Sequence, residues 1–140
     1  MSSSKHEAIE LQYLIFRTFS KIKKHADSIF RKHNLTGAQV GVLSRLPEEV
    51  GKPMNKLGEE LWCDVSNITG VVERLEKNGL VWRNTDPGDR RVSLICITEI
   101  GKKSLSKTLP EHERVLIGHF GKLTPDERKT LIKLLHKLTD

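Results

Sequence analysis

Apolar side chains recur every three or four residues along much of the chain, which is the spacing of one buried face on an α-helix. The first such stripe predicts a helix over residues 5–33, and its members are Ile9, Tyr13, Phe16, Phe19, Ile22, Ala26 and Ile29. The last stripe consists of Leu131, Leu134, Leu135 and Leu138. The first helix carries more apolar surface than a small domain usually covers, and the last has no evident partner within the chain except the first. We therefore expect part of this surface to face a second subunit.

Capping signals divide residues 35–80 into three shorter helices. Thr36 and Gln39 have capping-box spacing, so a helix is expected to begin directly after Thr36. Asn55 and Asp64 are candidate N-caps of the next two helices. The apolar stripe of the last of these three helices is Ile68, Val71, Val72 and Leu75. This helix should end at Gly79, which supplies the left-handed residue of a C-terminal cap.

After residue 80 the pattern is that of a β-hairpin followed by more helix. Residues 81–83 and 92–97 predict two short strands, and residues 84–89 between them are rich in turn-forming side chains. Thr98 can cap the helix that follows, which Pro110 is expected to kink or interrupt. A final helix is expected to start at the Thr-Pro-Asp-Glu run beginning at residue 124.

This order of elements predicts a fold that is mainly α with a small β-hairpin, in a single domain over residues 1–140. A winged helix-turn-helix is expected over residues 35–104, with flanking helices over residues 1–34 and 105–140. The second helix of a helix-turn-helix lies in the major groove of DNA and reads base edges near its N-terminus. The outward-facing candidates on that helix are Ser66, Asn67, Thr69, Gly70 and Arg74. Taken alone, these residues fit an ordinary surface helix equally well.

The hairpin favours DNA binding over that simpler interpretation. Asp89, Arg90 and Arg91 lie at its expected tip, where an arginine can enter a narrow minor groove. A solvated turn with local ion pairs would explain the tip by itself. A capped helix followed directly by an arginine-bearing hairpin is much less common by chance.

Composition narrows the classes of function. The net charge of +6 is typical of a partner for nucleic acid, although residues 41–80 hold more acidic than basic side chains. No apolar run approaches the ~20 residues of a membrane span, and the N-terminus lacks a signal-peptide pattern, so we expect a cytoplasmic protein with no membrane partner. No nucleophile elbow, phosphate-binding glycine loop or HExxH run occurs, so we expect no enzyme.

The candidate metal and redox residues point to structural roles. The two cysteines, Cys63 and Cys96, lack the spacing of a disulfide framework or a zinc site. Cys63 precedes the reading helix and could sense redox state, but buried structural thiols are the favoured interpretation of both. The histidines are scattered, although His112 and His119 lie two helical turns apart. We expect neither a metal nor a cofactor.

Two segments carry a resemblance to a known family. VSNITGVVERLEKNGLV at 65–81 and DPGDRRVSLICITEIG at 86–101 closely resemble the recognition helix and wing of the MarR (multiple antibiotic resistance regulator) family. LTPDERKTLIKLL near the C-terminus resembles the dimerisation helix of that family, so the resemblance covers nearly the whole chain. It implies an obligate homodimer whose first and last helices interlock, which would cover the two unpartnered stripes.

The resemblance also assigns roles. It implies that Ser66, Asn67 and Thr69 face the groove, that Asp89 braces the wing, that Arg91 enters the minor groove and that Arg90 contacts phosphate. Many members have a long basic residue where this chain has Gly70, so Asn67 is expected to carry more of the direct base readout.

The predicted function is therefore a sequence-specific regulator, a repressor, on a pseudo-palindromic site in duplex DNA. Family members often release DNA when a small aromatic or lipophilic anion enters a cleft between the dimer helices and the reading head. Phe16, Phe19, His25 and Phe30 are candidate lining residues of such a cleft, with core and dimer packing as the favoured interpretation. The alternative function is a winged-helix protein-interaction module, which would have no need of adjacent arginines at the wing tip.

Overall fold

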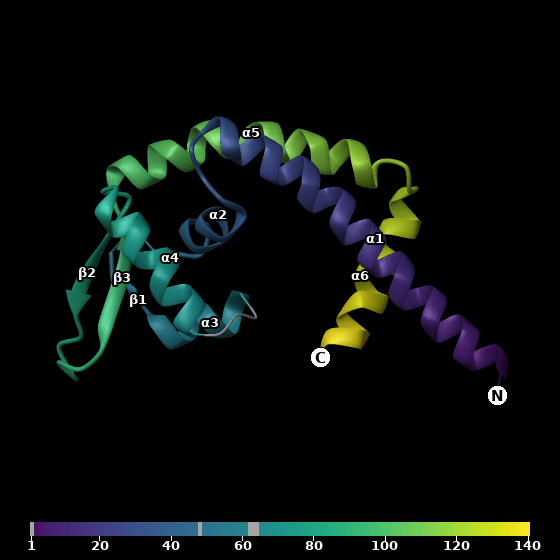
Figure 1. Ribbon diagram of the computed structural model, residues 1–140, viewed down its shortest axis with the longest axis horizontal. Coiled ribbons are helices and arrows are strands. Elements are labelled where there is room, and N and C mark those ends of the chain that lie inside the picture. Colours follow the sequence, from purple (N-terminus) through teal and green to yellow (C-terminus); the bar gives the residue numbers. More distant parts are fainter. Residues whose placement is uncertain (1, 48, 62–64) are drawn as a thin grey trace.

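The computed structural model describes residues 2–47, 49–61 and 65–140, with only the backbone of residues 65 and 66. Along the chain the elements are α1 (Ser2–Lys32), α2 (Gly37–Leu43), β1 (Lys52–Pro53), α3 (Met54–Leu61), α4 (Val65–Lys77), β2 (Val81–Thr85), β3 (Ser93–Ile97), α5 (Glu99–Phe120) and α6 (Pro125–Thr139). Figure 1 shows the short helices and the sheet gathered beneath one end of α5, while α1 extends away from them to the N-terminus. Within the described residues, no helix combines the length and apolar character needed to cross a bilayer.

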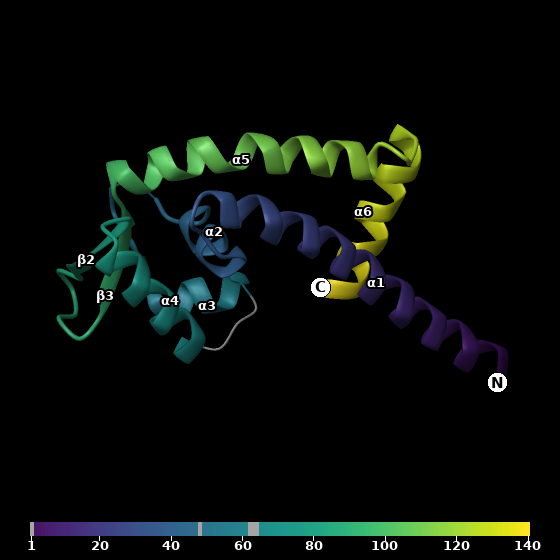
Figure 2. The same ribbon diagram turned by 45° about the horizontal axis from the view of Figure 1, so that its top comes forward.

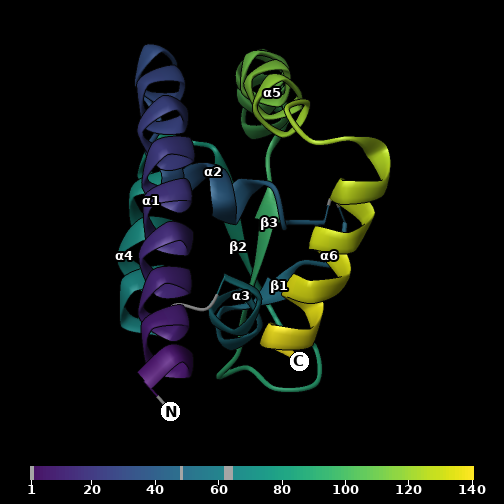
Figure 3. The same cartoon turned by 90° about the vertical axis from the view of Figure 1, so that its right-hand side faces the viewer.

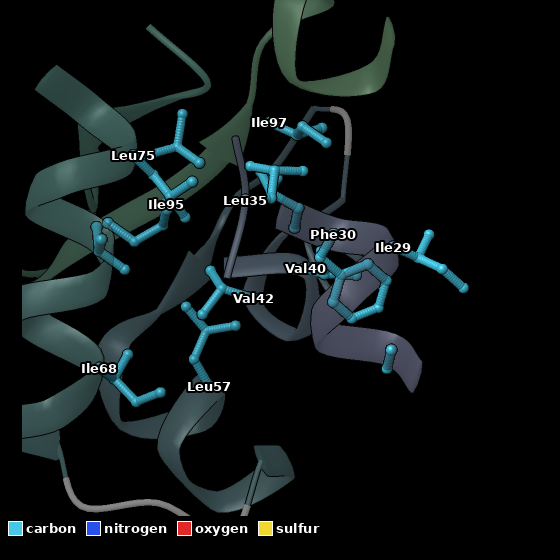
Figure 4. Close-up of a cluster of buried hydrophobic side chains, with 14 residues drawn as sticks. Ile29, Phe30, Leu35, Val40, Val42, Leu57, Ile68, Leu75, Ile95 and Ile97 are labelled. Carbon is cyan, nitrogen blue, oxygen red and sulfur yellow. The ribbon is translucent and has the colours of Figure 1, made fainter. Parts of the chain in front are cut away.

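One hydrophobic core joins α2, α3, α4, the sheet and the C-terminal end of α1. Its fully buried side chains include Val42, Leu43, Leu57, Val72, Leu75 and Ile95. Figure 4 shows Val42 of α2 beside Leu57 of α3, and Phe30 of α1 beside Val40 of α2. Burying side chains of this size contributes about 1.5–3 kcal/mol each, so this cluster dominates the stability of the folded chain.

The sheet has three antiparallel strands in the order β1-β3-β2. Val81 pairs with Ile97, and Thr85 pairs with Ser93, so the two long strands are in register over their whole length. On the other edge of β3, Lys52 pairs with Ile95. The predicted hairpin is therefore confirmed, and a third short strand extends it.

The predicted helix ends are confirmed where capping residues set them. Thr36 and Gln39 form the full capping box of α2: the Thr36 amide donates to Gln39 Oε1 over 2.9 Å, and the Gln39 amide donates to Thr36 Oγ1 over 3.2 Å. The same reciprocal pair occurs at the start of α6. At the end of α4, Gly79 adopts a φ of 76° and the Leu80 amide donates to the Leu75 carbonyl over 2.9 Å. Local sequence therefore determines these boundaries.

Two predicted boundaries were wrong near the sheet. Asn55 does not cap α3, because the helix begins at Met54 directly after β1 and places Asn55 inside its first turn. The pairing of β1 with β3 takes over the role assigned to a cap. Pro53 pairs with Leu94 on this edge strand, a position where a residue without an amide hydrogen is tolerated. Asn84 and Thr85 belong to β2 and not to the turn. Asp64, the candidate cap of α4, lies outside the described residues.

Pro110 was predicted to kink or interrupt α5, and the interruption does not occur. The helix continues from Glu99 to Phe120 with Pro110 inside it at an exposed position. Proline removes one backbone hydrogen bond, but on the solvent side water can satisfy the carbonyl left behind. Thr108, two residues earlier, is fully buried, and its hydroxyl donates to the Ser104 carbonyl of the same helix over 2.7 Å.

The two long terminal helices leave apolar faces uncovered in a single chain. On α1 only Ala26, Ile29 and Phe30 are buried, and on α6 no described residue is. The exposed large apolar residues of these helices are Ile9, Leu11, Tyr13, Leu14, Ile15, Phe16 and Phe19 on α1 and Ile132, Leu134, Leu135 and Leu138 on α6. Figure 3 shows the N-terminal half of α1 and α6 on opposite sides of the view below α5.

Gly101, in the first turn of α5, offers a test of this packing. A Cβ there would collide with the Leu80 carbonyl oxygen and lie 2.8 Å from Ile97 Cγ1, whereas a Cβ at Gly118 on the same helix meets nothing within 4 Å. We expect Gly101→Ala to lower the free energy of unfolding by about 1–3 kcal/mol, because backbone cannot move aside as a side chain can. Gly118→Ala should leave it unchanged or raise it by up to about 1 kcal/mol. Chemical denaturation at one fixed protein concentration measures both, and equal effects would contradict the close approach.

Candidate nucleic-acid interface

Helix α4 is held by its inner face, which leaves its outer face to solvent. Ile68, Val72 and Leu75 are at most 2% exposed and pack against α2 and α3. The stripe predicted from sequence is thus confirmed, with Val71 partly buried at its edge. Figure 4 shows Ile68 of α4 beside Leu57 of α3. An amphipathic helix anchored in this way presents its polar face in a fixed direction.

The residues of α4 that were predicted to contact base edges differ in their exposure to solvent. Asn67, Gly70 and Arg74 are exposed, and their spacing of three and four residues places them on one face of α4. Thr69 is half-buried beside that face. The side chain of Ser66 lies outside what the structure describes. A Cβ added at Gly70 would meet nothing within 4 Å, so packing does not require glycine there and its effect is to leave the reading face open.

The loop between β2 and β3 is a tightly hydrogen-bonded turn. The Asp86 amide donates to the Val92 carbonyl over 3.0 Å and closes the loop at its base. The Gly88 amide donates to Asp86 Oδ1 over 2.8 Å, which is the Asx-turn geometry favoured by aspartate. A further bond from the Val92 amide to the Asp89 carbonyl, 3.0 Å, tightens the tip. The tip therefore has a defined shape on which to mount side chains.

Asp89 and Arg91 form a cluster of three hydrogen bonds at this tip. Asp89 Oδ1 accepts from the Arg91 amide at 3.0 Å and from Arg91 Nε at 3.1 Å, while Asp89 Oδ2 accepts from Arg91 Nη2 at 3.2 Å. The Arg91 side chain is nevertheless 91% exposed. The hydrogen bonds from the Arg91 side chain and then its amide lower the pKa of Asp89 below the ordinary value of 3.8. Asp89 thus orients a guanidinium that solvent, or a phosphate backbone, can still reach.

A second ion pair, which sequence reasoning missed, ties α4 to the hairpin. Arg83 Nε on β2 lies 3.1 Å from Glu76 Oε1 near the end of α4. The signal in the sequence was a pair of opposite charges on the two sides of the Gly79 turn. Exposed pairs add little stability, so the value of this one is geometric: it helps set the angle between helix and hairpin.

The reading helix and the hairpin tip face the same side of the molecule. In Figures 1 and 2 the N-terminal end of α4 and the loop after β2 both point away from α5. Arg90 and Arg91 on this tip are both exposed. A single partner surface could therefore contact the Asn67 face of α4 and the two arginines of the hairpin tip at the same time.

A groove of about 740 Å³ lies between α1, the start of α2 and α5. Phe19, Ile22, Ala26 and Leu35 supply much of its apolar lining. Of the four predicted lining residues, Phe19 is in this groove, Phe30 is buried in the core and His25 lines a different cleft. Phe16 is 67% exposed on the part of α1 beyond the core.

The structure describes one of the two cysteines and most of the candidate metal ligands. Cys96 is buried on β3, and burial raises the pKa of its thiol, which disfavours the reactive thiolate. Cys63 lies outside the described residues. Among the part of the chain that the structure describes, no three histidine, cysteine, aspartate or glutamate side chains come together as metal ligands.

Comparison with known proteins places this geometry in a family. The model of the MarR family matches residues 35–93, which span α2 to the start of β3. The uncharacterized HTH-type transcriptional regulator YkoM of Bacillus subtilis is 30% identical over 93% of this chain and 84% of its own length.

Two solved structures are similar over nearly the whole chain. A single-site mutant of MarR from E. coli, complexed with operator DNA, has a TM-score of 0.85 and 26% identity, covering 96% of each chain. BpsR of Bordetella bronchiseptica, whose DNA binding is regulated by 6-hydroxynicotinic acid, has a TM-score of 0.73 and 27% identity over 91% of this chain and 99% of its own.

The Asp89–Arg91 cluster leads to a titration test. Arg91→Gln removes the guanidinium but keeps the backbone amide, so we expect the pKa of Asp89 to rise part of the way toward 3.8. Carboxyl carbon NMR during an acid titration reports this pKa directly. Arg90→Gln is the matched control, because Arg90 contributes nothing to the lowering, and it should leave the pKa of Asp89 where it is. An equal rise in both variants would mean that general positive charge, and not this contact, lowers the pKa.

Proposed function

The chain belongs to the MarR family of transcriptional regulators, and we propose that it is a homodimeric repressor that binds a pseudo-palindromic site in duplex DNA. The observation that carries this proposal is the placement of α4 and the Asp89–Arg91 tip on one side of the molecule, tied together through Glu76 and Arg83. A winged helix-turn-helix uses that arrangement to put a helix into the major groove and a hairpin against the neighbouring minor groove. Such a protein acts in the cytoplasm by binding, without catalysis.

Each element has a distinct task in this proposal. Ser66, Asn67 and Thr69, near the N-terminus of α4, contact base edges, while Arg74 further along reaches a phosphate or a base. Arg91 enters the minor groove and Arg90 contacts phosphate. Asp89 contacts no DNA and acts as a positioning residue. Because Gly70 adds no side chain to the reading face, Asn67 carries more of the direct readout and the wing more of the affinity.

The exposed apolar faces of α1 and α6 support the homodimer. Faces of this extent are uncommon on a monomer and mark surfaces that associate. A second copy of the chain would cover them and set the two α4 helices about 34 Å apart, in successive major grooves of one face of the duplex.

The groove between α1, α2 and α5 supports release by a small molecule. Its apolar wall includes Phe19, Ile22 and Leu35. Lys23 and Asp27 of the same lining pair with each other over 2.7 Å, so Arg31 is the cation available to a small aromatic or lipophilic anion. DNA binding by the similar protein BpsR is regulated by such a compound. The groove reaches the start of α2, and α2 packs on α4, so an occupant could displace the reading helix.

Selection of bound sequences from a random duplex DNA pool tests the function. The wild-type protein should enrich a pseudo-palindrome with half-sites about one helical turn apart. Arg91→Ala should weaken binding to all sequences and lower the salt dependence by about one counterion, because it removes a charge next to the backbone. Asn67→Ala should relax base preference at one position per half-site, with a cost of about 1–3 kcal/mol against the preferred base.

Two results would contradict this assignment. Uniform loss of affinity across the site library in both variants would show that Asn67 does not read bases. No enriched sequence, with only weak and salt-sensitive binding, would favour the protein-interaction module in place of a DNA-binding regulator.

The dimer is tested by charging the uncovered face of α6. Leu134→Asp/Leu138→Asp places four carboxylates in the proposed interface of a dimer, so we expect the dimer dissociation constant to rise at least about 100-fold. Sedimentation equilibrium measures it. Lys133→Asp/Lys137→Asp adds the same residues one position earlier on α6, so it controls for helix propensity while changing the net charge more than the leucine pair does. This control variant should remain a dimer. If both double variants were monomeric, loss of the dimer would not depend on the leucine face of α6, which would contradict the proposed interface.

A further inference from the structure

A second cleft lies between α1 and α5, on the other side of α1 from the groove described above. Its volume is about 210 Å³. Lys21 and His25 line it from α1, and His112, His119 and Lys122 line it from α5 and the turn that follows. Its apolar floor is Ile22, Val115 and Leu116. No carboxylate is among the side chains that the structure places around it.

Two acidic residues of α1 and α5 are engaged with other lysines. Asp27 Oδ2 lies 2.7 Å from Lys23 Nζ, and Glu111 Oε1 lies 2.9 Å from Lys32 Nζ. None of these four residues lines the cleft. Among the described residues, no carboxylate forms an ion pair with Lys21 or Lys122.

Two of the three imidazoles are held in place by aromatic neighbours. The His112 ring meets Phe30 edge to face, with centroids 5.0 Å apart and an interplanar angle of 65°. The His119 ring meets Phe120 in the same way, at 5.0 Å and 87°. His112 Nδ1 is buried and has no hydrogen-bond partner within the described structure. A buried polar nitrogen without a partner is costly, so a ligand that supplies one gains free energy.

The arrangement suits an anion better than a metal ion. The histidines share a cleft, yet no three potential ligands among the described residues converge closely enough to coordinate a metal. The imidazole and ammonium groups are instead distributed around the cleft. Groups of these kinds can donate hydrogen bonds to several oxygens of one oxyanion. Two lysine charges match the two negative charges of a phosphate group.

We propose that this cleft between α1 and α5 binds a dianionic phosphate group, carried by a small organic monoester. The phosphate lies between Lys21 and Lys122 and accepts hydrogen bonds from the imidazoles of His25, His112 and His119. The organic part rests on Ile22, Val115 and Leu116. A cavity of about 150 Å³ holds a benzene ring, so the space here admits a phosphate with a compact body.

This site goes beyond the proposed function, because it is separate from the DNA interface and from the groove beside α2. Only Ile22 and His112 are shared by the two cavities. A phosphate held by residues of both helices would fix the angle at which α1 and α5 diverge. Its binding therefore stabilises the folded protein by mass action, whatever small molecule releases DNA.

Titration calorimetry on the full-length protein, at matched ionic strength, tests the proposal. The probes are phenyl phosphate, inorganic phosphate and phenol. We expect phenyl phosphate to bind and phenol to give no heat. Tighter binding of phenyl phosphate than of inorganic phosphate assigns the site to monoesters, and equal binding assigns it to free phosphate. Binding of phenol as tight as that of phenyl phosphate, or no binding of either phosphate, overturns the proposal.

Variants locate the binding in the cleft. Lys21→Gln/Lys122→Gln should weaken phenyl phosphate at least about 10-fold, as expected for the loss of charge-assisted hydrogen bonds. Lys24→Gln/Lys103→Gln removes one exposed lysine outside the cleft from each of α1 and α5 and should leave affinity unchanged. Equal weakening in both pairs would mean nonspecific attraction and sink the site. Selection of DNA by the same proteins is measured separately, so failure here is distinguishable from failure of the proposed function.

Discussion

The shared hydrophobic core beneath α5 is the constraint on which the rest of the structure depends. Leu57 of α3, Val72 and Leu75 of α4 and Ile95 of β3 are all fully buried in it. Because the inner face of α4 and the central strand pack into the same cluster, neither can move without disturbing the other. The outer face of α4 and the tip between β2 and β3 are thereby held in one relative position, and the Glu76–Arg83 pair refines it at the surface.

The same core reaches the long helices through a few residues of α1. Ile29 and Phe30 are buried with α2, and Phe30 also meets His112 of α5. Lys32 and Glu111 link the two helices again at their exposed edge. Both cavities lie next to this crossing, so an occupant of either one acts on the joint between the reading head and the long helices. A ligand can shift an equilibrium only by its differential affinity for two arrangements, and this joint is where such a difference would arise.

Sequence predicted those features that depend on neighbours a few residues away. The capping box of Thr36, the left-handed Gly79 and the Asp89–Arg91 turn are all local, and all occur as expected. Strand β1 has only two residues and exists because it pairs with β3 some forty residues later, which no local pattern encodes. Pro110 does not end α5 because it lies on the exposed side of the helix, where water can satisfy the carbonyl that loses its partner. The spacing of His112 and His119 predicted a shared face, but their meeting with His25 required the crossing of α1 and α5.

Helix α6 shows why the single chain is an incomplete structure. Its capping box and its proline at the first turn favour helix locally. Yet a helix of 15 residues is marginal in water by itself, and packing of an apolar face normally supplies the remainder. Within one chain α6 buries no residue, so that packing has to come from another molecule. The folding of α6 is then coupled to association, and its stability depends on protein concentration. Since the two reading heads of a dimer are spaced by these same helices, the geometry presented to DNA would be set by the contact that orders α6.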